Sequence, residues 1–162
     1  FSRRDDFQRR VISLEPIFTE SIRLLDPLAA QRGISIQSSL ESATCHGDPQ
    51  ALAIATGNLI SNAICHQSSG GSATVKTYIS DGHAIFEVAD TGPGIAAEHL
   101  PRLLDRFYRI DSARGSEGGH SGLGLAIVKA IAENHHGHIE VESEPGKGSM
   151  FRLKIPTHQS GA

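Results

Sequence analysis

Three polar side chains recur at every fourth position within residues 51–66, ALAIATGNLISNAICH, a stretch that is otherwise apolar and almost uncharged. They are Asn58, Asn62 and His66, and this spacing places them on one face of a helix. Asparagine competes for backbone hydrogen bonds and is a mediocre helix former. The stripe therefore indicates either a face that binds a polar ligand or side chains that cap and bridge the neighbouring backbone.

Three glycine-containing segments offer further places where a ligand could approach the main chain. In Asp90-Thr91-Gly92-Pro93-Gly94-Ile95 a carboxylate ends an expected strand, and glycine permits backbone angles that are closed to other residues. A type II turn is the alternative explanation. Gly122-Leu123-Gly124-Leu125 opens an expected helix, whose free N–H groups and positive dipole end would attract an anion. Gly146-Lys147-Gly148-Ser149 by itself is an ordinary hairpin turn.

Helices and hairpin-paired strands are interspersed along the chain. Asp48-Pro49 supplies an N-cap and a proline at the first helical position, and Asp81-Gly82 is a strong hairpin signal. Pro27 should end or bend the first helix, and Gly137 should cap the last one. The order predicts an α+β sandwich in which a mixed sheet carries helices on one face. The predicted helices cover residues 13–31, 49–67, 97–106 and 122–135, and the predicted strands cover residues 33–37, 73–80, 83–89, 139–143 and 149–155.

The composition is typical of one soluble globular domain. The chain has 162 residues, of which 38% are hydrophobic and 20% charged, and a formal net charge of -3. This charge gives no electrostatic reason to expect nucleic-acid or membrane binding. No apolar run approaches the ~18 residues of a membrane span. Cys45 and Cys65 are too few for a disulfide framework or a cysteine metal cluster, which favours a reducing compartment. Without an initiator Met, the sequence is expected to be a fragment of a larger protein.

Taken together and in order, NLISNA, DTGPGI, RFYR, GLGLAIVKAIAENHHG and GKGSMF closely resemble the catalytic ATP-binding domain of bacterial sensor histidine kinases. The resemblance covers residues 13–156. It implies the fold shared with the gyrase and mismatch-repair ATPases, the Bergerat-type two-layer α/β sandwich, whose mostly antiparallel mixed sheet is backed by about three helices. Residues 1–12 would then be a remnant of a dimerisation helix or a linker, and residues 157–162 a flexible tail. The sequence of residues 114–137 also resembles that of the heavy-metal-responsive subgroup.

The resemblance assigns a role to each motif. Asn62 would present its amide oxygen to Mg²⁺, a cation that prefers hard oxygen ligands. Asp90 would accept a hydrogen bond from the adenine amino group, with help from the Ser149 hydroxyl. Asp105–Arg109 resembles an aromatic box at the base of a lid over the nucleotide, in which Phe107 is a core anchor and Arg106 or Arg114 adds positive charge. The glycines of residues 115–124 would make this lid mobile.

The site residues that follow from the resemblance form one set that binds ATP and Mg²⁺. Three of them, Asn58, Asn62 and Arg109, would be catalytic, and Asn62 would also be the metal ligand. The implied nucleotide-binding residues are Asn58, Asn62, His66, Asp90, Gly92, Gly94, Ile95, Tyr108, Arg109, Gly122, Leu123, Gly124, Leu125 and Ser149.

Asn58 favours a kinase over a hydrolase. Gyrase-type relatives carry a Glu at this position as the base for an attacking water, and a carboxamide cannot take up a proton near neutral pH. The site would position ATP and donate its γ-phosphoryl group to a histidine on a separate dimerisation domain, for onward transfer to an Asp of a response regulator. No acceptor motif of the form His-Glu-Leu/Ile-Arg occurs in the sequence. The full-length protein would be a homodimer of the inner membrane with this domain on its cytoplasmic side.

Two alternatives and two unusual positions complete the predictions. Cys65 stands where the family usually has Lys or Arg, so ATP binding should be weak or compensated by His66 or a lid Arg. This position favours one alternative, a nucleotide-binding regulatory module that has lost phosphotransfer. A gyrase-type ATPase is the other alternative, and Asn58 argues against it. The cluster His135-His136-Gly137-His138 raises the alternative of a metal site, whereas His135 also matches a frequent family position at a helix end.

Overall fold

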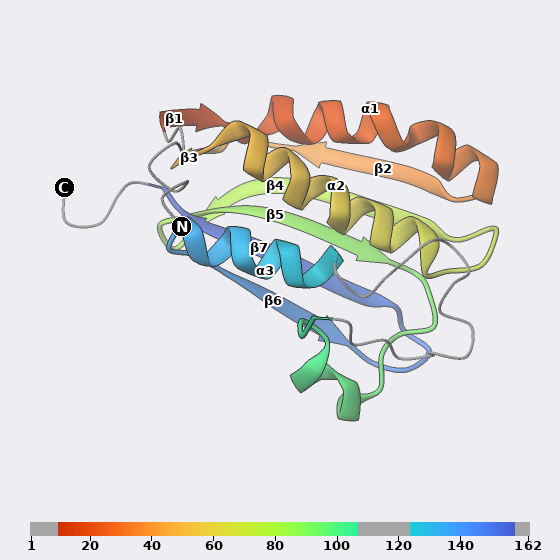
Figure 1. The fold of residues 1–162 in the computed structure, drawn as a ribbon. Helices are drawn as coiled ribbons and strands as arrows, with labels where there is room; N and C mark the ends of the chain where they lie inside the picture. Colours follow the sequence, from red (N-terminus) through yellow and green to blue (C-terminus); the bar gives the residue numbers. More distant parts are fainter. Residues whose placement is uncertain (1–9, 107–123, 158–162) are drawn as a thin grey trace.

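Three helices cover one face of a five-stranded sheet in the computed structural model, which describes residues 10–106 and 124–157 (Figure 1). The strand order is β2-β4-β5-β7-β6; β2 runs parallel to β4, and the other neighbours are antiparallel. The predicted α+β sandwich is therefore confirmed. The elements are β1 (Arg10–Ser13), α1 (Leu14–Arg32), β2 (Ser35–Leu40), β3 (Thr44–Gly47), α2 (Pro49–Cys65), β4 (Ser72–Ser80), β5 (His83–Asp90), the 3-10 helix η2 (Ala97–Arg102), α3 (Gly124–Asn134), β6 (His138–Ser143) and β7 (Ser149–Pro156).

Local signals explain how the central elements begin and turn. The Asp48 side chain caps α2 by accepting a hydrogen bond from the backbone N–H of Gln50 at 3.0 Å. Asp81 and Gly82 both have positive φ angles, 52° and 73°, as the two central residues of a type I′ hairpin turn require. The parallel pairing of β2 with β4 needs a crossover connection, and α2 lies within it.

Helix α1 continues beyond the proline that was expected to end or bend it. Pro27 lies inside α1, which ends only at Gly33 in the left-handed conformation with φ 72°. Pro27 is on the exposed side of the helix. Water can therefore satisfy the carbonyl group that loses its helical N–H partner, so the helix tolerates the ring there.

The cap at the end of α3 differs from the prediction. His136, and not Gly137, adopts the positive φ angle, 62°. The Gly137 N–H donates to the Ala132 carbonyl at 2.8 Å. A Cβ atom on Gly137 would lie 1.9 Å from the Lys154 carbonyl oxygen. Glycine is thus required at residue 137 for a close approach of α3 to β7, and the left-handed turn falls on the preceding residue.

A two-stranded sheet was not predicted from the sequence. Arg10–Ser13 forms β1, which pairs antiparallel with β3, Thr44–Gly47. Residues 10–12, predicted as the end of a dimerisation helix or a linker, are therefore extended and paired with this domain. Residues 97–106 also differ from the predicted α-helix, because a 3-10 helix covers only Ala97–Arg102.

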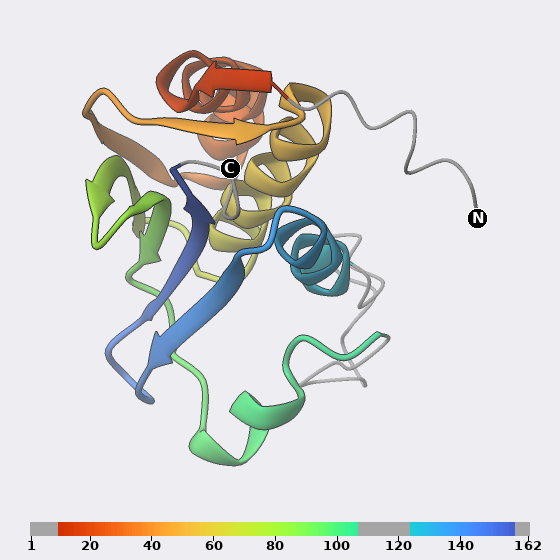
Figure 2. The ribbon, with the colours of Figure 1, turned by 90° about the vertical axis from the view of Figure 1, so that its left-hand side faces the viewer.

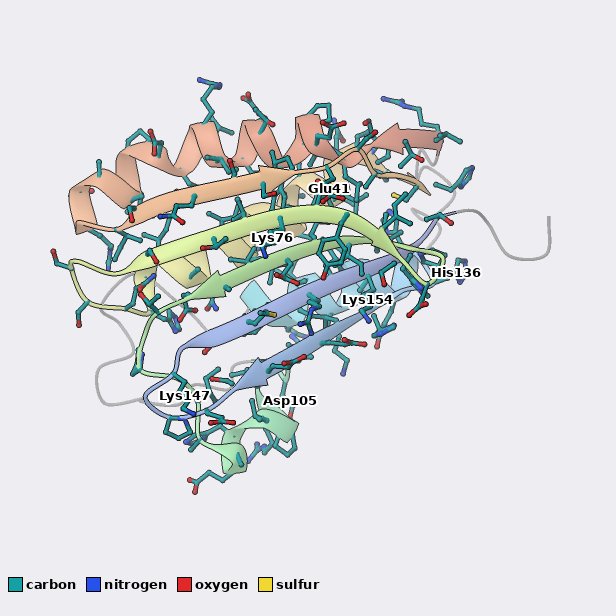
Figure 3. The ribbon with its side chains drawn as sticks, turned by 180° about the vertical axis from the view of Figure 1, so that it is seen from behind. Glu41, Lys76, Asp105, His136, Lys147 and Lys154 are labelled. Atoms are coloured by element: carbon teal, nitrogen blue, oxygen red, sulfur yellow. The ribbon has the colours of Figure 1, made fainter. Side chains whose placement is uncertain are left out.

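The core lies between the helices and the sheet, and the other face of the sheet is polar. Phe18 of α1 and Phe86 of β5 meet edge-to-face with ring centroids 4.6 Å apart, and both side chains are fully buried. Figure 2 shows the sheet with the helices on one side only. On the opposite face, Lys76 and Lys154 project from β4 and β7 (Figure 3), and the Lys154 ammonium contacts a Glu140 carboxylate oxygen at 3.1 Å.

Candidate functional site

The central residue of the polar stripe on α2 is a buried side chain with an unmet hydrogen-bonding capacity. Asn62 is only 8% exposed. Within residues 10–106 and 124–157, its carboxamide has no hydrogen-bond partner, although its backbone carbonyl accepts from the His66 N–H at 3.1 Å. A buried polar group without a partner costs about 1–3 kcal/mol. The arrangement therefore suits a ligand that contacts this amide.

The first residue of the stripe meets the start of α3. A Cβ atom added to Gly124 would lie 3.4 Å from Asn58 Oδ1, so the N-terminus of α3 packs beside this carboxamide. The first N–H groups of a helix have no partner within the helix and carry its positive dipole end. Leu125, the next residue, is half-buried and packs against the hydrophobic core. Asn58 and the start of α3 together offer donors to an anion.

The third residue of the stripe, His66, caps the C-terminal end of α2 and is exposed. It lies eight residues after Asn58, a distance of about 12 Å along a helix. The glycine turn after β5 packs against this end, because a Cβ atom on Gly92 would lie 2.9 Å from the His66 carbonyl oxygen. The α2 segment from Asn58 to His66 is therefore flanked by the start of α3 at one end and by the turn after Asp90 at the other.

Asp90 ends β5 with its carboxylate half-buried beside this turn. Burial raises the pKa of Asp90 above its ordinary value, and hydrogen bonds from the backbone N–H groups of Gly92 and Ser149 act in the opposite direction. The Gly92 N–H lies 2.9 Å from Asp90 Oδ1. Ser149 is the partner of Asp90 in the β5–β7 register. The strand end thus holds a carboxylate that is partly desolvated and oriented by two backbone donors.

The remaining turn residues pack on the β6–β7 connection. Gly94 has a φ of 79°, and a Cβ atom there would lie 2.0 Å from the Glu144 carbonyl oxygen. The Ile95 N–H donates to the Ser143 hydroxyl at 2.8 Å, and the hydroxyls of Ser143 and Ser149 are 2.9 Å apart. Gly94 and Ile95 therefore lie in a turn that packs on the β6–β7 connection, and their predicted contact with a nucleotide stays a prediction. The Ser149 hydroxyl already has a protein partner.

Two residues near this site, Gln67 and Thr91, were not predicted from the sequence. The Thr91 hydroxyl donates to Gln67 Oε1 at 2.9 Å, and the Gln67 amide donates to the Ala63 carbonyl at 3.0 Å. They join the turn after Asp90 to α2. No sequence signal marks the pair, because polar residues at a helix end and in a turn are common and their contact depends on the tertiary structure.

Six predicted positions fall outside the part of the chain that the structure describes. Tyr108, Arg109, Gly122 and Leu123 lie outside the described residues, as do Phe107 and Arg114. Arg106 is described and is exposed. Cys65 is half-buried near the end of α2, and the other thiol, Cys45, is buried in the core, where desolvation raises its pKa to about 12.

The histidines after α3 do not converge. His135 is buried; its Nε2 accepts from the Asp48 N–H at 3.0 Å, and its Nδ1 lies 2.8 Å from the Ile131 carbonyl oxygen. His138 instead contacts Glu140 at 2.9 Å. In the part of the chain that the structure describes, no group of three or more His, Cys, Asp or Glu residues could hold a metal ion.

An apolar groove lies between α1 and α2, and Asn58 is one of its lining residues. It has a volume of about 590 Å³. Its lining includes Ile17, Leu24, Leu25 and Ile54, so it offers few partners for phosphate groups.

None of the helices described is long and apolar enough to cross a lipid bilayer.

Comparison with known proteins shows that this chain is similar to histidine kinases. The model of the family described as histidine kinase-, DNA gyrase B-, and HSP90-like ATPase matches residues 47–159. The sensor-like histidine kinase SenX3 of Mycolicibacterium smegmatis is 43% identical over 112 residues, which cover 69% of this chain and 29% of that protein. The chain therefore spans less than a third of the length of this relative.

Solved structures of sensor kinases share the fold. The mycobacterial sensor histidine kinase MprB superposes with a TM-score of 0.82 at 27% identity, over 92% of this chain and 99% of that chain. Full-length ShkA in complex with AMPPNP gives a TM-score of 0.82 at 27% identity, over 96% of this chain and 32% of that chain. AMPPNP resembles ATP, so a protein with this fold binds an adenine nucleotide.

Proposed function

Because this chain belongs to the family of histidine kinase-, DNA gyrase B-, and HSP90-like ATPases, we propose that it is the ATP-binding catalytic domain of a sensor histidine kinase. In this proposal it binds Mg-ATP and donates the γ-phosphoryl group to a histidine of a separate dimerisation domain. The observation that carries the proposal is the buried carboxamide of Asn62, which lacks a partner in the described chain and lies between the start of α3 and the turn after Asp90.

The phosphate end of the nucleotide would lie along α2 toward α3. Asn62 would contribute an amide oxygen to Mg²⁺, which takes hard oxygen ligands and few of them from protein. The bound ion would neutralise charge on the phosphates. Asn58 and the first N–H groups of α3 would contact phosphate oxygens, and residues 108, 109, 122 and 123 are proposed to complete this end. The Asn62 carboxamide fits the ion in type, because it can offer a hard oxygen ligand, whereas the N–H groups of α3 suit the phosphates.

The adenine end would lie at Asp90. Its carboxylate accepts hydrogen bonds and would pair with the exocyclic amino group of adenine, whereas it would repel the carbonyl oxygen of guanine. A hydrogen bond to a charged group contributes about 1.5–3 kcal/mol, and an unpaired buried carboxylate costs at least as much. This difference is enough to select ATP over GTP. Gly92, beside this carboxylate, would leave room for the base, and His66 and Ser149 are proposed to contact the nucleotide from the sides.

Phosphoryl transfer in this scheme needs no base from this chain to activate water. A ring nitrogen of the acceptor histidine attacks the γ-phosphorus, the bond to the bridging oxygen breaks, and ADP leaves with that electron pair. The imidazole then loses the N–H proton of its other ring nitrogen to its surroundings. Asn58 cannot take up a proton near neutral pH, which favours transfer to histidine over hydrolysis. The phosphoryl group would pass onward to an Asp of a response regulator.

The parent protein is proposed to be a homodimeric sensor of the inner membrane, with this domain on its cytoplasmic side. The heavy-metal-responsive subgroup stays a prediction, as does the domain boundary near residue 13. Cys65 supports one other candidate, a regulatory module that binds nucleotide without transferring phosphate. A gyrase-type ATPase would instead hydrolyse ATP steadily without any acceptor domain.

Nucleotide titration and a transfer assay test the proposal. The wild-type chain should bind ATP more tightly than GTP, and Asp90→Asn should reduce ATP affinity by about tenfold or more while changing GTP affinity little. Thr77→Val, which removes a buried hydrogen bond to the Glu41 carbonyl far from the site, is the control for nonspecific destabilisation. With the dimerisation domain added, ATP should yield phosphohistidine. Nucleotide binding without phosphohistidine would support the regulatory module, and an absence of ATP binding would refute both.

A further inference from the structure

The turn after Asp90 is tied to α2 and to the start of β4 by a closed set of hydrogen bonds around two side chains. Gln67 Nε2 donates to the Ala63 carbonyl at 3.0 Å and to the Ser72 carbonyl at 2.9 Å. The Thr91 hydroxyl donates to Gln67 Oε1 at 2.9 Å and accepts from the Ser72 N–H at 3.0 Å. We call Gln67 and Thr91, with these contacts, the Gln67–Thr91 bridge.

The bridge uses most of the hydrogen-bonding capacity of both side chains. A carboxamide has two N–H donors and a carbonyl acceptor. Gln67 donates two hydrogen bonds and accepts one. A hydroxyl has one donor, and Thr91 uses it while also accepting one hydrogen bond. The Thr91 N–H adds a backbone bond to the Ser72 carbonyl at 3.2 Å. Polar networks that are satisfied in this way hold one geometry, because any shift leaves a donor or acceptor unpaired.

The chain leaves room for the bridge by having glycine on both sides of it. A Cβ atom on Gly71 would lie 2.1 Å from Gln67 Oε1, and one on Gly92 would lie 3.1 Å from Gln67 Cβ. Gln67 thus fills the gap between the end of α2 and the turn after β5. The two positions that it joins adjoin the candidate site, since Ala63 follows Asn62 and Thr91 follows Asp90.

We propose that Gln67 and Thr91 are positioning residues that set the adenine selectivity of the site by fixing the Asp90 carboxylate relative to the Asn62 face of α2. Neither side chain need touch the nucleotide. If the turn could shift, the Asp90 carboxylate would still accept a hydrogen bond from water. It would no longer align with the adenine amino group of a nucleotide whose phosphates are held at Asn62. This inference rests on the proposed nucleotide binding.

A matched pair of substitutions at residue 91 tests the bridge. Thr91→Val keeps the shape of the side chain and removes the hydroxyl, whereas Thr91→Ser keeps the hydroxyl. Thr91→Val should weaken ATP binding about tenfold and leave GTP binding within about twofold, so that the ratio of the two affinities falls. Thr91→Ser should restore most of the ratio. Gln67→Met removes the amide and should lower the ratio to a similar extent.

The double variant and a distant control separate positioning from loss of stability. If the two side chains act as one unit, Gln67→Met with Thr91→Val should lower the ratio little more than either change alone. Thr77→Val should lower the melting temperature without changing the ratio. An unchanged ratio in both Thr91→Val and Gln67→Met, or additive effects in the double variant, would overturn the bridge. If the wild type itself fails to bind ATP, the proposed function fails instead.

Discussion

The two ends of the candidate site differ in how far the protein itself satisfies their polar groups. At the proposed adenine end, the Asp90 carboxylate accepts from the N–H groups of Gly92 and Ser149, and the Gln67–Thr91 bridge holds the adjoining turn. At the proposed phosphate end, the Asn62 carboxamide is buried without a partner in the described chain. The proposed base-recognition end is therefore preorganised by backbone and side-chain hydrogen bonds of the protein, whereas the proposed phosphate end leaves a buried amide unsatisfied among the described residues.

Removal of the Asn62 carboxamide should disturb the proposed phosphate end and is expected to have the largest effect. Asn62→Ala should weaken ATP binding in the presence of Mg²⁺ by about 100-fold, which corresponds to ~2.7 kcal/mol. The free energy of unfolding of the nucleotide-free chain should change by less than about 1 kcal/mol, because the lost packing is offset by removal of an unsatisfied group. Calorimetric titration and urea unfolding measure the two quantities. A large loss of stability with unchanged ATP affinity would mean that Asn62 is a structural residue.

Two glycines in one turn allow the adenine end to be disturbed with an internal control. Gly146 and Gly148 have φ angles of 82° and 81°, so alanine is strained to a similar extent at either position. A Cβ atom at Gly148 would lie 2.0 Å from the Asp90 carbonyl oxygen, whereas Gly146 faces open space. Gly148→Ala should therefore cost at least about 1 kcal/mol more unfolding free energy than Gly146→Ala. It should also weaken ATP binding, and equal effects of the two changes would contradict this.

Addition of a cation beside the phosphate end should sharpen the contrast. Cys65 is one turn away from Asn62 and half-buried, where the sequence predicted that a phosphate contact is lost. Cys65→Arg should strengthen ATP binding about threefold to tenfold at low salt, with the gain reduced at high salt by screening. Cys65→Ser is the control for removal of the thiol. Unchanged or weaker binding in the Arg variant would argue that the site already balances the phosphate charge.

The smallest expected effect concerns the desolvation of Asp90. Because burial raises its pKa, the folded chain binds more protons than the unfolded chain between pH 3.8, the ordinary pKa, and the raised value. The free energy of unfolding should therefore fall as pH rises through this window, and this contribution should be absent from Asp90→Asn. Urea unfolding of both chains across acidic pH measures the difference. A contribution of the opposite sign would show that the two N–H donors outweigh burial.

Much of the fold follows from local signals in the sequence. Asp48 and Pro49 start α2, and Asp81 and Gly82 turn β4 into β5, because each depends on groups only a few residues apart. The order of the motifs likewise predicted the family and the mixed sheet with helices on one face. The candidate site could be predicted as a set of residue types, since the spacing of Asn58, Asn62 and His66 defines one helix face.

Other features were decided only by tertiary structure. The pairing of β1 with β3 joins segments more than 30 residues apart in the chain, for example Ser13 with Thr44. Gln67 and Thr91, which are separated by 24 positions, are linked by a hydrogen bond that neither local sequence indicates. Glycine at residue 137 is required by the Lys154 carbonyl of another element and not by its own backbone angles. Such contacts depend on which surfaces meet when the sheet assembles, whereas caps and turns depend on neighbours that are already present in the unfolded chain.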